Sequence, residues 1–131
     1  MNNVLLDTCV LVEILHKNQN VKQIITDIGW ENCYISDITV VELLFGAEVS
    51  QNPQKNLPIV KSLLKSFAII PFSVCINYFC KEKARLSKIG KLIDDNDLYI
   101  GTTAVAVNMP IYTYNVKHFS RIEGLKLYDI N

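Results

Sequence analysis

The sequence predicts an α/β fold, specifically a three-layer α/β/α sandwich with a mostly parallel central sheet. Short apolar runs without polar alternation, such as "NNVLL" at 2–6 and "FAIIPF" at 67–72, are typical of strands covered on both faces. Longer segments with helical spacing of apolar residues separate these runs, and alternation of strands with helices favours parallel pairing. The length of 131 residues suits a single domain spanning 1–131.

The first half of the chain alternates predicted strands and helices. Asp7 closes the first apolar run, and an aspartate in that place is a good N-cap for the helix that follows. The third predicted helix is apolar on both sides of Glu42. The expected elements are a strand at 2–6, a helix at 8–18, a helix at about 20–29, a strand at 33–37 and a helix at 37–50.

Proline and glycine separate the predicted elements of the second half. The segment "NPQKNLP" is the strongest predicted loop, because Pro53 and Pro58 mark the approach to a further helix. Gly90 ends a later helical stretch. The expected elements are a loop at 52–58, a strand at 67–72, helices at 74–90 and 91–109, a strand at 110–114 and a final strand at 124–130.

Composition and charge exclude several classes of protein. With 13 basic and 13 acidic side chains the formal charge is zero, so nucleic-acid binding would depend on a local basic patch. A secretory signal would require a basic residue near its start, and no Lys or Arg precedes Lys17. No apolar window is long enough for a membrane span. We therefore expect a cytoplasmic protein without a membrane partner.

The four cysteines lie in apolar stretches without a Cys-x-x-Cys pair. This pattern favours small core residues of a reduced protein over disulfides. A zinc site built from Cys75, Cys80 and a histidine is the alternative, although the spacing matches no usual zinc pattern. The residues concerned are Cys9, Cys33, Cys75 and Cys80.

Three carboxylates stand in apolar surroundings: Asp7 after the first strand, Glu42 between "ITVV" and "LLFG", and Asp97 before "LYIG". A buried ionised carboxylate costs several kcal/mol unless it is paired or metal-bound. A shared divalent cation would account for all three together. Oxygen ligands without a converging Cys or His set favour Mg²⁺ or Mn²⁺ over zinc.

Each acid also has an ordinary structural explanation. Asp7 alone is more readily explained as an N-cap than as a catalytic group, and Glu42 would be exposed if the helix were rotated from its expected phase. Asp94 or Asp95 can begin the next helix, which places Asp97 in its first turn near the positive end of the helix dipole. We expect Asp97 to be the metal ligand of this cluster.

Four segments in the same order resemble the PIN-domain ribonucleases, and among them the VapC toxins of bacterial toxin–antitoxin pairs. Each segment alone is a weak signal, whereas the set covers nearly the whole chain. The segments are "LLDTCVLVEIL" at 5–15, "ISDITVVELLFGA" at 35–47, "IDDNDLYIGTTAVA" at 93–106 and "IYTYNVKHFSRIEGLKLYDI" at 111–130.

The resemblance implies a Mg²⁺-dependent endoribonuclease, with Mn²⁺ as a possible substitute, that acts as the toxin of a pair. It implies that Asp7, Glu42 and Asp97 are catalytic metal ligands. Many members carry a fourth acid after the penultimate strand, and Asn115 stands at that place here, which puts a tightly bound second ion in doubt. Further residues implied in the site are Thr8, Thr113 and Asn115 as ordering groups and Asp94 as a ligand through water.

Basic residues near the predicted site are candidates for RNA contacts. Arg85 and Lys88 lie with Lys81 on one face of the helix at 74–90, and a solvated helix face is an equally good explanation for Lys81 and Lys83. We also expect contacts from residues after Asn115. These are Lys117 and Arg121, while His118 suits an RNA contact or a structural role better than that of a base, and His16 suits a surface or capping role.

The first helix carries more apolar side chains than one contact with a sheet requires, which suggests a groove for a partner segment. The resemblance implies a VapB-like antitoxin in that role, together with a homodimer. A degenerate PIN domain that binds RNA or protein without cutting is the main alternative; the intact Asp7, Glu42 and Asp97 argue against it, while Asn115 leaves it open. An aspartyl-phosphate enzyme is disfavoured, because the dehalogenase type needs Asp-x-Asp where this chain has Asp7-Thr8-Cys9.

Overall fold

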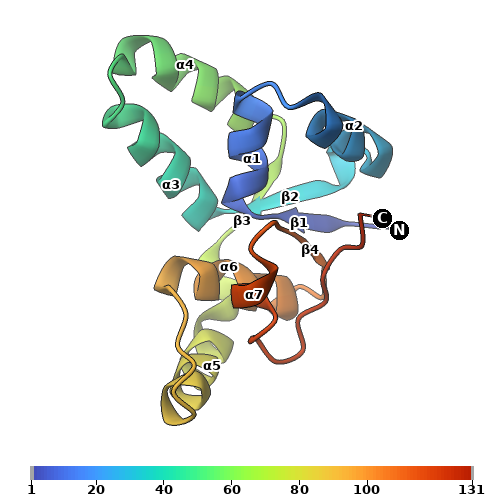
Figure 1. Ribbon diagram of the computed structural model, residues 1–131, viewed down its shortest axis with the longest axis vertical. Coiled ribbons are helices and arrows are strands. Elements are labelled where there is room, and N and C mark those ends of the chain that lie inside the picture. The colour runs from blue at the N-terminus through green and yellow to red at the C-terminus, as the bar shows by residue number, and fades with distance from the viewer. Residues whose placement is uncertain (1, 131) are drawn as a thin grey trace.

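A computed structural model describes residues 2–130 and contains a sheet with helices on both faces, as Figure 1 shows. All pairings in the four-stranded sheet are parallel, in the order β3-β2-β1-β4. The prediction of an α/β/α sandwich is confirmed. The strands are β1 (Val4–Leu6), β2 (Cys33–Ser36), β3 (Ala68–Ile70) and β4 (Ile111–Tyr112).

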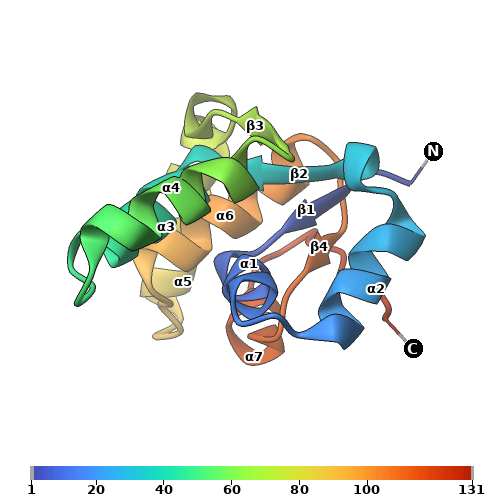
Figure 2. The same cartoon turned by 90° about the horizontal axis from the view of Figure 1, so that it is seen from above.

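The layer on one face of the sheet contains the first four helices, which surround β1 and β2 in the view from above (Figure 2). Val10 and Leu11 of the first helix are fully buried and pack in the same core as Leu43 and Val60. The helices are α1 (Thr8–Leu15), α2 (Gln19–Ile28), α3 (Asp37–Glu48) and α4 (Pro53–Leu64), with a short 3-10 turn η1 (Trp30–Asn32) before β2.

The opposite face is covered by the later helices, which lie below the sheet in Figure 1. The second core lies here, and Leu98, Ile100 and Phe119 are completely buried in it. The helices are α5 (Ile76–Lys88), α6 (Asp95–Ala106) and α7 (Val116–Phe119), with a 3-10 turn η2 (Phe72–Cys75) before α5. None of the helices within residues 2–130 has the length and hydropathy that a bilayer crossing requires.

The predicted loop at 52–58 is wrong, because these residues begin helix α4. Asn52 caps the helix by accepting a hydrogen bond from the Lys55 amide, and Pro53 occupies the first turn, where a missing N–H costs nothing. Pro58 lies inside the helix and is exposed, so the carbonyl group left without its helical partner faces water. Prolines that suggested a loop thus mark a helix start and a tolerated interruption.

The predicted final strand is also wrong, because its only pairing in the described residues is a single bridge between Leu127 and Ile111. The Ile111 amide donates to the Lys126 carbonyl at 2.9 Å, and the Tyr128 amide donates to the Ile111 carbonyl at 2.7 Å. The short helix α7 was not predicted. Helix α6 begins at Asp95 with Asp94 as its N-cap, as the aspartate cluster predicted, so residues 91–93 of the wider expected range lie before it.

All four cysteines are free, as predicted, but they are not all core residues. Cys33 and Cys75 are buried, whereas Cys9 is half-buried and Cys80 is exposed on α5. Within residues 2–130 no three His, Cys, Asp or Glu side chains lie close enough together to hold a metal ion by themselves. The zinc alternative built on Cys75 and Cys80 is therefore not supported.

Parallel pairing brings the carboxyl ends of β1, β2 and β4 to one edge of the sheet, where ligands gather in open α/β folds. Asp7 directly follows β1, Ser36 ends β2 and Thr113 directly follows β4. Asp7 and Ser36 are both N-caps, of α1 and α3, so the polar side chains at this edge also begin the helices.

Candidate active site

Asp7 is buried, with 4% of its surface exposed, at the junction of β1 and α1. Its Oδ1 accepts a hydrogen bond of 2.8 Å from the Thr8 amide, which is the capping interaction. Its Oδ2 accepts 2.7 Å from the Thr113 hydroxyl and 3.2 Å from the Cys9 thiol. Asp7 therefore caps the helix and also lies in the polar cluster at the sheet edge.

The surroundings of Asp7 disfavour its charge. Burial raises the pKa of the Asp7 carboxyl, and the nearby charge of Asp97 adds to the effect, while hydrogen bonds from Thr113, Cys9 and Thr8 partly oppose it. In the described residues Asp7 forms no ion pair with a Lys, Arg or His. A bound cation would offset the cost of burying the negative charge of Asp7.

Asp7→Asn is expected to raise the melting temperature near neutral pH, by about 2–6 °C for a domain of this size. Because the folded pKa of Asp7 lies above its unfolded value, the stability that its neutral form contributes is lost as pH rises through the folded pKa. Asparagine keeps the neutral form, so the difference should shrink on acidification. Thermal unfolding of both proteins at neutral and acid pH, without added metal, measures it; a lower melting temperature for Asp7→Asn at neutral pH contradicts the argument.

Glu42 lies on α3 and is half-buried, so the alternative of an exposed Glu42 is not supported. The Thr8 hydroxyl donates to its Oε1 at 2.6 Å, and the Asn96 amide group donates to its Oε2 at 3.2 Å. Thr8 thus contacts Asp7 through its backbone and Glu42 through its side chain. Asn96 lies directly before Asp97 in α6, so Glu42 is also tied to the helix that carries the third acid.

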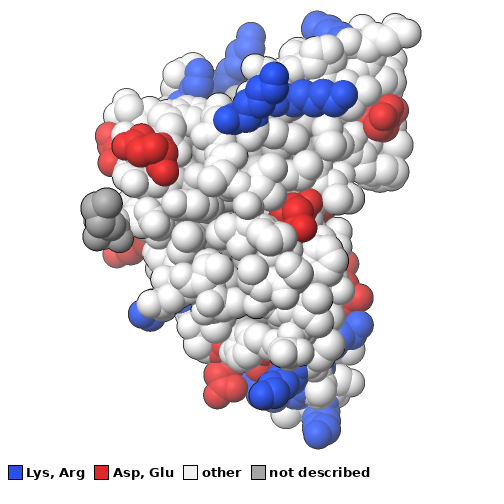
Figure 3. Space-filling view, turned by 180° about the vertical axis from the view of Figure 1, so that it is seen from behind, with Lys and Arg blue, Asp and Glu red and all other residues white. Residues whose placement is uncertain are grey.

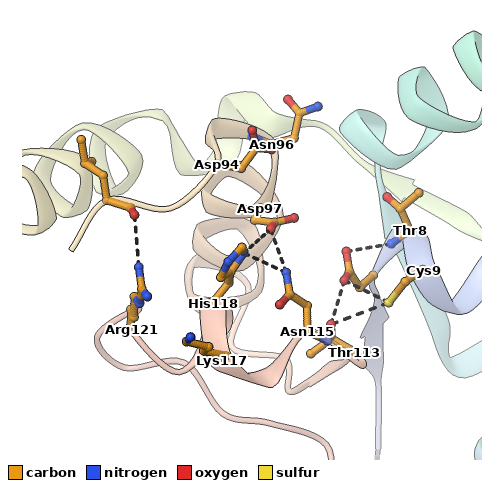
Figure 4. Close-up of polar contacts among 12 residues, drawn as sticks. Thr8, Cys9, Asp94, Asn96, Asp97, Thr113, Asn115, Lys117, His118 and Arg121 are labelled. Carbon is orange, nitrogen blue, oxygen red and sulfur yellow. Dashed lines mark hydrogen bonds and ion pairs between the residues drawn. The ribbon is translucent and has the colours of Figure 1, made fainter.

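Asp97 lies in the first turn of α6, and one of its oxygens contacts residues after β4 (Figure 4). Its Oδ2 lies 3.0 Å from Asn115 Nδ2 and 3.1 Å from His118 Nδ1. The Asn115 backbone amide donates to the Thr113 hydroxyl at 2.9 Å, and that hydroxyl donates to Asp7. A continuous chain of hydrogen bonds therefore joins Asp97 to Asp7.

Thr8 thus links Asp7 to Glu42, and Thr113 and Asn115 link Asp7 to Asp97. The types of residue present fit a hard divalent cation. Carboxylate, hydroxyl and amide oxygens are the ligands that Mg²⁺ and Mn²⁺ prefer. Across residues 2–130, the only ion pair of these three acids joins Asp97 to His118. Since no three metal-ligating side chains converge closely, water would have to supply part of the coordination.

Asp94 and Asp95 occupy different places from Asp97. Asp94 is exposed and caps α6 by accepting a hydrogen bond of 3.2 Å from the Asn96 amide. Asp95 forms an exposed ion pair with Lys83 at 3.1 Å. No side-chain hydrogen bond or ion pair among the described residues joins Asp94 to Asp7, Glu42 or Asp97, so a water-mediated metal role for Asp94 is supported only by its place three residues before Asp97.

The basic residues expected to bind RNA differ in what they contact. Lys117 is exposed on α7, next to His118. Arg121 donates to the Lys91 and Leu92 carbonyl oxygens at 3.4 and 3.2 Å and so holds the segment before α6. Figure 3 shows that Lys and Arg side chains on one face gather near its two ends, with a largely uncharged surface between them.

Arg85 belongs to a structural ion pair. Its Nε and Nη2 donate to the two carboxylate oxygens of buried Glu82 at 2.7 and 2.9 Å, and Nη2 also donates to the Arg121 carbonyl. The pKa of Glu82 is lowered, chiefly by this hydrogen bonding. Lys88 is exposed in the last turn of α5. The structure therefore favours Lys117 over Arg85 as an RNA contact.

Sequence reasoning missed two residues that contact the acids, Cys9 and Asn96. Cys9 was assigned to the core, although its place two residues after Asp7 in a helix start could have suggested contact with the same carboxylate. Asn96 contacts Glu42, a residue 54 positions away, and no local pattern indicates such a contact. His16 is the C-cap of α1, as expected.

Comparisons with known proteins identify the family and agree with the fold. Residues 4–125 match the family profile described as PIN domain. Ribonuclease VapC1 of Methanocaldococcus jannaschii is 39% identical over 98% of this chain and 88% of its own length, and Ribonuclease VapC2 of Haemophilus influenzae is 34% identical over 70% of each chain. A crystal structure of DNA-bound VapBC from Salmonella typhimurium aligns with a TM-score of 0.89 and 26% identity over 98% of both chains. The resemblance inferred from the sequence is confirmed, and the chain belongs to the PIN domain family.

Proposed function

We propose that this chain is a single-domain, cytoplasmic endoribonuclease that depends on Mg²⁺, with Mn²⁺ able to substitute, and acts as the toxin of a toxin–antitoxin pair. The observation that carries the proposal is the cluster of Asp7, Glu42 and Asp97 at the carboxyl edge of the sheet. Within residues 2–130, no Lys or Arg forms an ion pair with any of these three acids. The curated relatives named above are ribonucleases, and PIN-domain ribonucleases generally need a divalent metal.

In the proposed reaction the three acids hold the cation, which when bound neutralises charge on the scissile phosphate and lowers the pKa of bound water. Thr8 holds the carboxylates of Asp7 and Glu42 in fixed relative positions, since its backbone amide donates to Asp7 and its hydroxyl donates to Glu42. Thr113 and Asn115 do the same for Asp7 and Asp97. Lys117 is exposed beside this cluster and supplies a positive charge for the RNA backbone.

A cleavage assay tests the activity directly. We expect a labelled single-stranded RNA to be cut with Mg²⁺ or Mn²⁺, cutting to stop with EDTA and to return when metal is restored, and Asp7→Asn to lose at least about 100-fold in rate. Cleavage that survives both EDTA and the substitution contradicts the mechanism. RNA binding without cleavage under every metal condition would instead support the degenerate, non-cutting alternative.

The antitoxin is proposed to occupy a groove between α1, α3 and α4. This groove, with a volume of about 430 Å³, is lined by Val12 and Leu15 of α1 and reaches Glu42 in the active site. The structure of a related protein described above is a VapBC complex. A partner in this groove would contact Thr8 and Glu42 and so hinder the approach of RNA to this side of the acidic cluster. Growth arrest on expression, relieved by Asp7→Asn and by the co-expressed antitoxin, is the expected result; unaffected growth contradicts the toxin assignment.

A homodimer is proposed to form through the outer face of α3. Val41, Phe45 and Val49 follow one another at a spacing of four residues and are 61%, 65% and 65% exposed. Three large apolar side chains on one exposed helix stripe mark an interaction surface. Sedimentation velocity should show a dimer that Phe45→Glu converts to a folded monomer, and a monomeric wild type contradicts this proposal.

A further inference from the structure

His118 makes a contact that the proposed function does not use. Its Nδ1 lies 3.1 Å from Asp97 Oδ2 and 2.9 Å from Asn115 Nδ2, while Asn115 Nδ2 lies 3.0 Å from the same Asp97 oxygen. Three polar atoms therefore form a closed triangle (Figure 4). The side chain of Asp97 is 20% exposed and that of His118 is 40% exposed, so the triangle lies at the rim of the acidic cluster.

The chemistry of the three atoms determines which of them donate. An ionised carboxylate oxygen only accepts, and an amide NH₂ group only donates. If Nδ1 of His118 carried a lone pair, it would face the Asp97 oxygen at 3.1 Å as a second acceptor, which is repulsive. If Nδ1 carries hydrogen, the unfavourable contact lies instead between the two nitrogens, which are 2.9 Å apart, but both of them then donate to one charged oxygen, and such charge-assisted hydrogen bonds are the stronger ones. The network therefore assigns a proton to Nδ1, as tautomers are assigned in general.

Both donors, Asn115 and His118, contact Oδ2 of Asp97, and neither contacts Oδ1. In residues 2–130 Asp97 Oδ1 has no hydrogen-bond partner. We propose that His118 is a positioning residue, which acts through Nδ1 to hold Asp97 so that Oδ1 is presented to the divalent cation. This inference rests on the proposed function, and of the two roles expected for His118, an RNA contact or a structural role, it favours the structural one, exerted through Asp97.

The backbone around His118 is held firmly enough for this role. Phe119, the next residue, is completely buried, and it packs with Ile122 against Gly101 of α6, the helix that carries Asp97. A side chain on Gly101 would overlap Ile122 Cδ1, so the two segments are closely packed at this point. The same packing that joins α7 to α6 therefore sets the distance from His118 to Asp97.

Two amide substitutions distinguish the roles of the two ring nitrogens of His118. In His118→Asn the amide nitrogen takes the place of Nδ1, and in His118→Gln it takes the place of Nε2. We expect His118→Asn to keep Mn²⁺ affinity close to that of the wild type, and His118→Gln to weaken it about 10-fold or more, as loss of a group supporting a metal ligand does. Electron paramagnetic resonance of free Mn²⁺ during titration measures the affinity, and thermal unfolding confirms that both variants fold.

Steady-state cleavage gives a second readout. With saturating metal, His118→Gln should lower kcat and leave KM for RNA unchanged, and His118→Asn should change neither. The reverse order, with Gln active and Asn impaired, would show that His118 acts through Nε2 and overturns the proposal, as would equal loss or no loss in both. Because Mn²⁺ binding is measured without RNA, a wild type that binds Mn²⁺ but does not cut contradicts the proposed function alone.

Discussion

Asp97→Asn is expected to reduce RNA cleavage at least about 100-fold at unchanged folding, whereas Asp95→Asn should retain nearly full activity. Asp97 is partly buried, accepts hydrogen bonds from Asn115 and His118, and lies in the cluster with Asp7 and Glu42. Asparagine at this position keeps the size of the side chain but removes the negative charge that attracts the cation. Initial rates of cleavage of one RNA by the three proteins provide the measurement.

Asp95 is a matched control, because it lies in the same helical turn and receives the same substitution. Its one ion pair, with Lys83, is exposed at 55% for the Asp95 side chain, and such pairs are worth about 0–1 kcal/mol. Asp95→Asn should therefore lower the melting temperature slightly and leave the rate unchanged. If Asp95→Asn were the more damaging to cleavage while both variants remained folded, the assignment of Asp97 as the ligand would be wrong.

Gly101→Ala is expected to destabilise the fold by about 1–3 kcal/mol or more, the range for overpacking a core. A Cβ atom at Gly101 would overlap Ile122 Cδ1 and lie 3.2 Å from Phe119 Cδ1, so these two buried side chains, and the segment after Asn115 that carries them, would have to shift. His118 and Asn115 would then move away from Asp97. Cleavage should fall even under conditions where the variant remains folded, and urea unfolding together with initial rates measures both effects.

Gly46→Ala is the control for Gly101→Ala, because both change a helical glycine. A Cβ atom at Gly46 meets nothing within 4 Å, and Gly46 is exposed on α3. Alanine in an open helix position is favoured over glycine by roughly 0.5–1 kcal/mol, so this variant should be more stable than the wild type. If Gly101→Ala were as stable as Gly46→Ala, the close packing of α6 on α7 would be contradicted.

The three acids could be selected from the sequence because their apolar neighbours made them conspicuous. Asp7 directly follows the buried strand β1, Glu42 lies in the apolar helix α3, and the parallel fold places the carboxyl ends of β1 and β2 at one edge. The same local signals supported the N-cap assignments of Asp7 and Asp94. The capping role of Asp7 and its place in the cluster proved to be compatible, because different oxygens of one carboxylate serve them.

The contacts between distant segments could not be predicted, because no local pattern encodes them. Asn96 contacts Glu42 across 54 positions and His118 contacts Asp97 across 21, and each depends on how two helices pack on the sheet. The error at 52–58 has another cause. Proline indicates a helix start as readily as a loop, and only the Asn52 cap before Pro53 distinguishes the two.

Titration of the metal-free protein with Mn²⁺, followed by electron paramagnetic resonance of the free ion, tests the central claim most directly. The matched comparison is Asp7→Asn against Asp27→Asn. Asp27 is an exposed aspartate in the last turn of α2, the helix that precedes the amino end of β2. The wild type and Asp27→Asn should bind Mn²⁺ equally, and Asp7→Asn should lose that binding while unfolding at a higher temperature. Equal Mn²⁺ binding by all three folded proteins would contradict the claim that Asp7 belongs to a metal site.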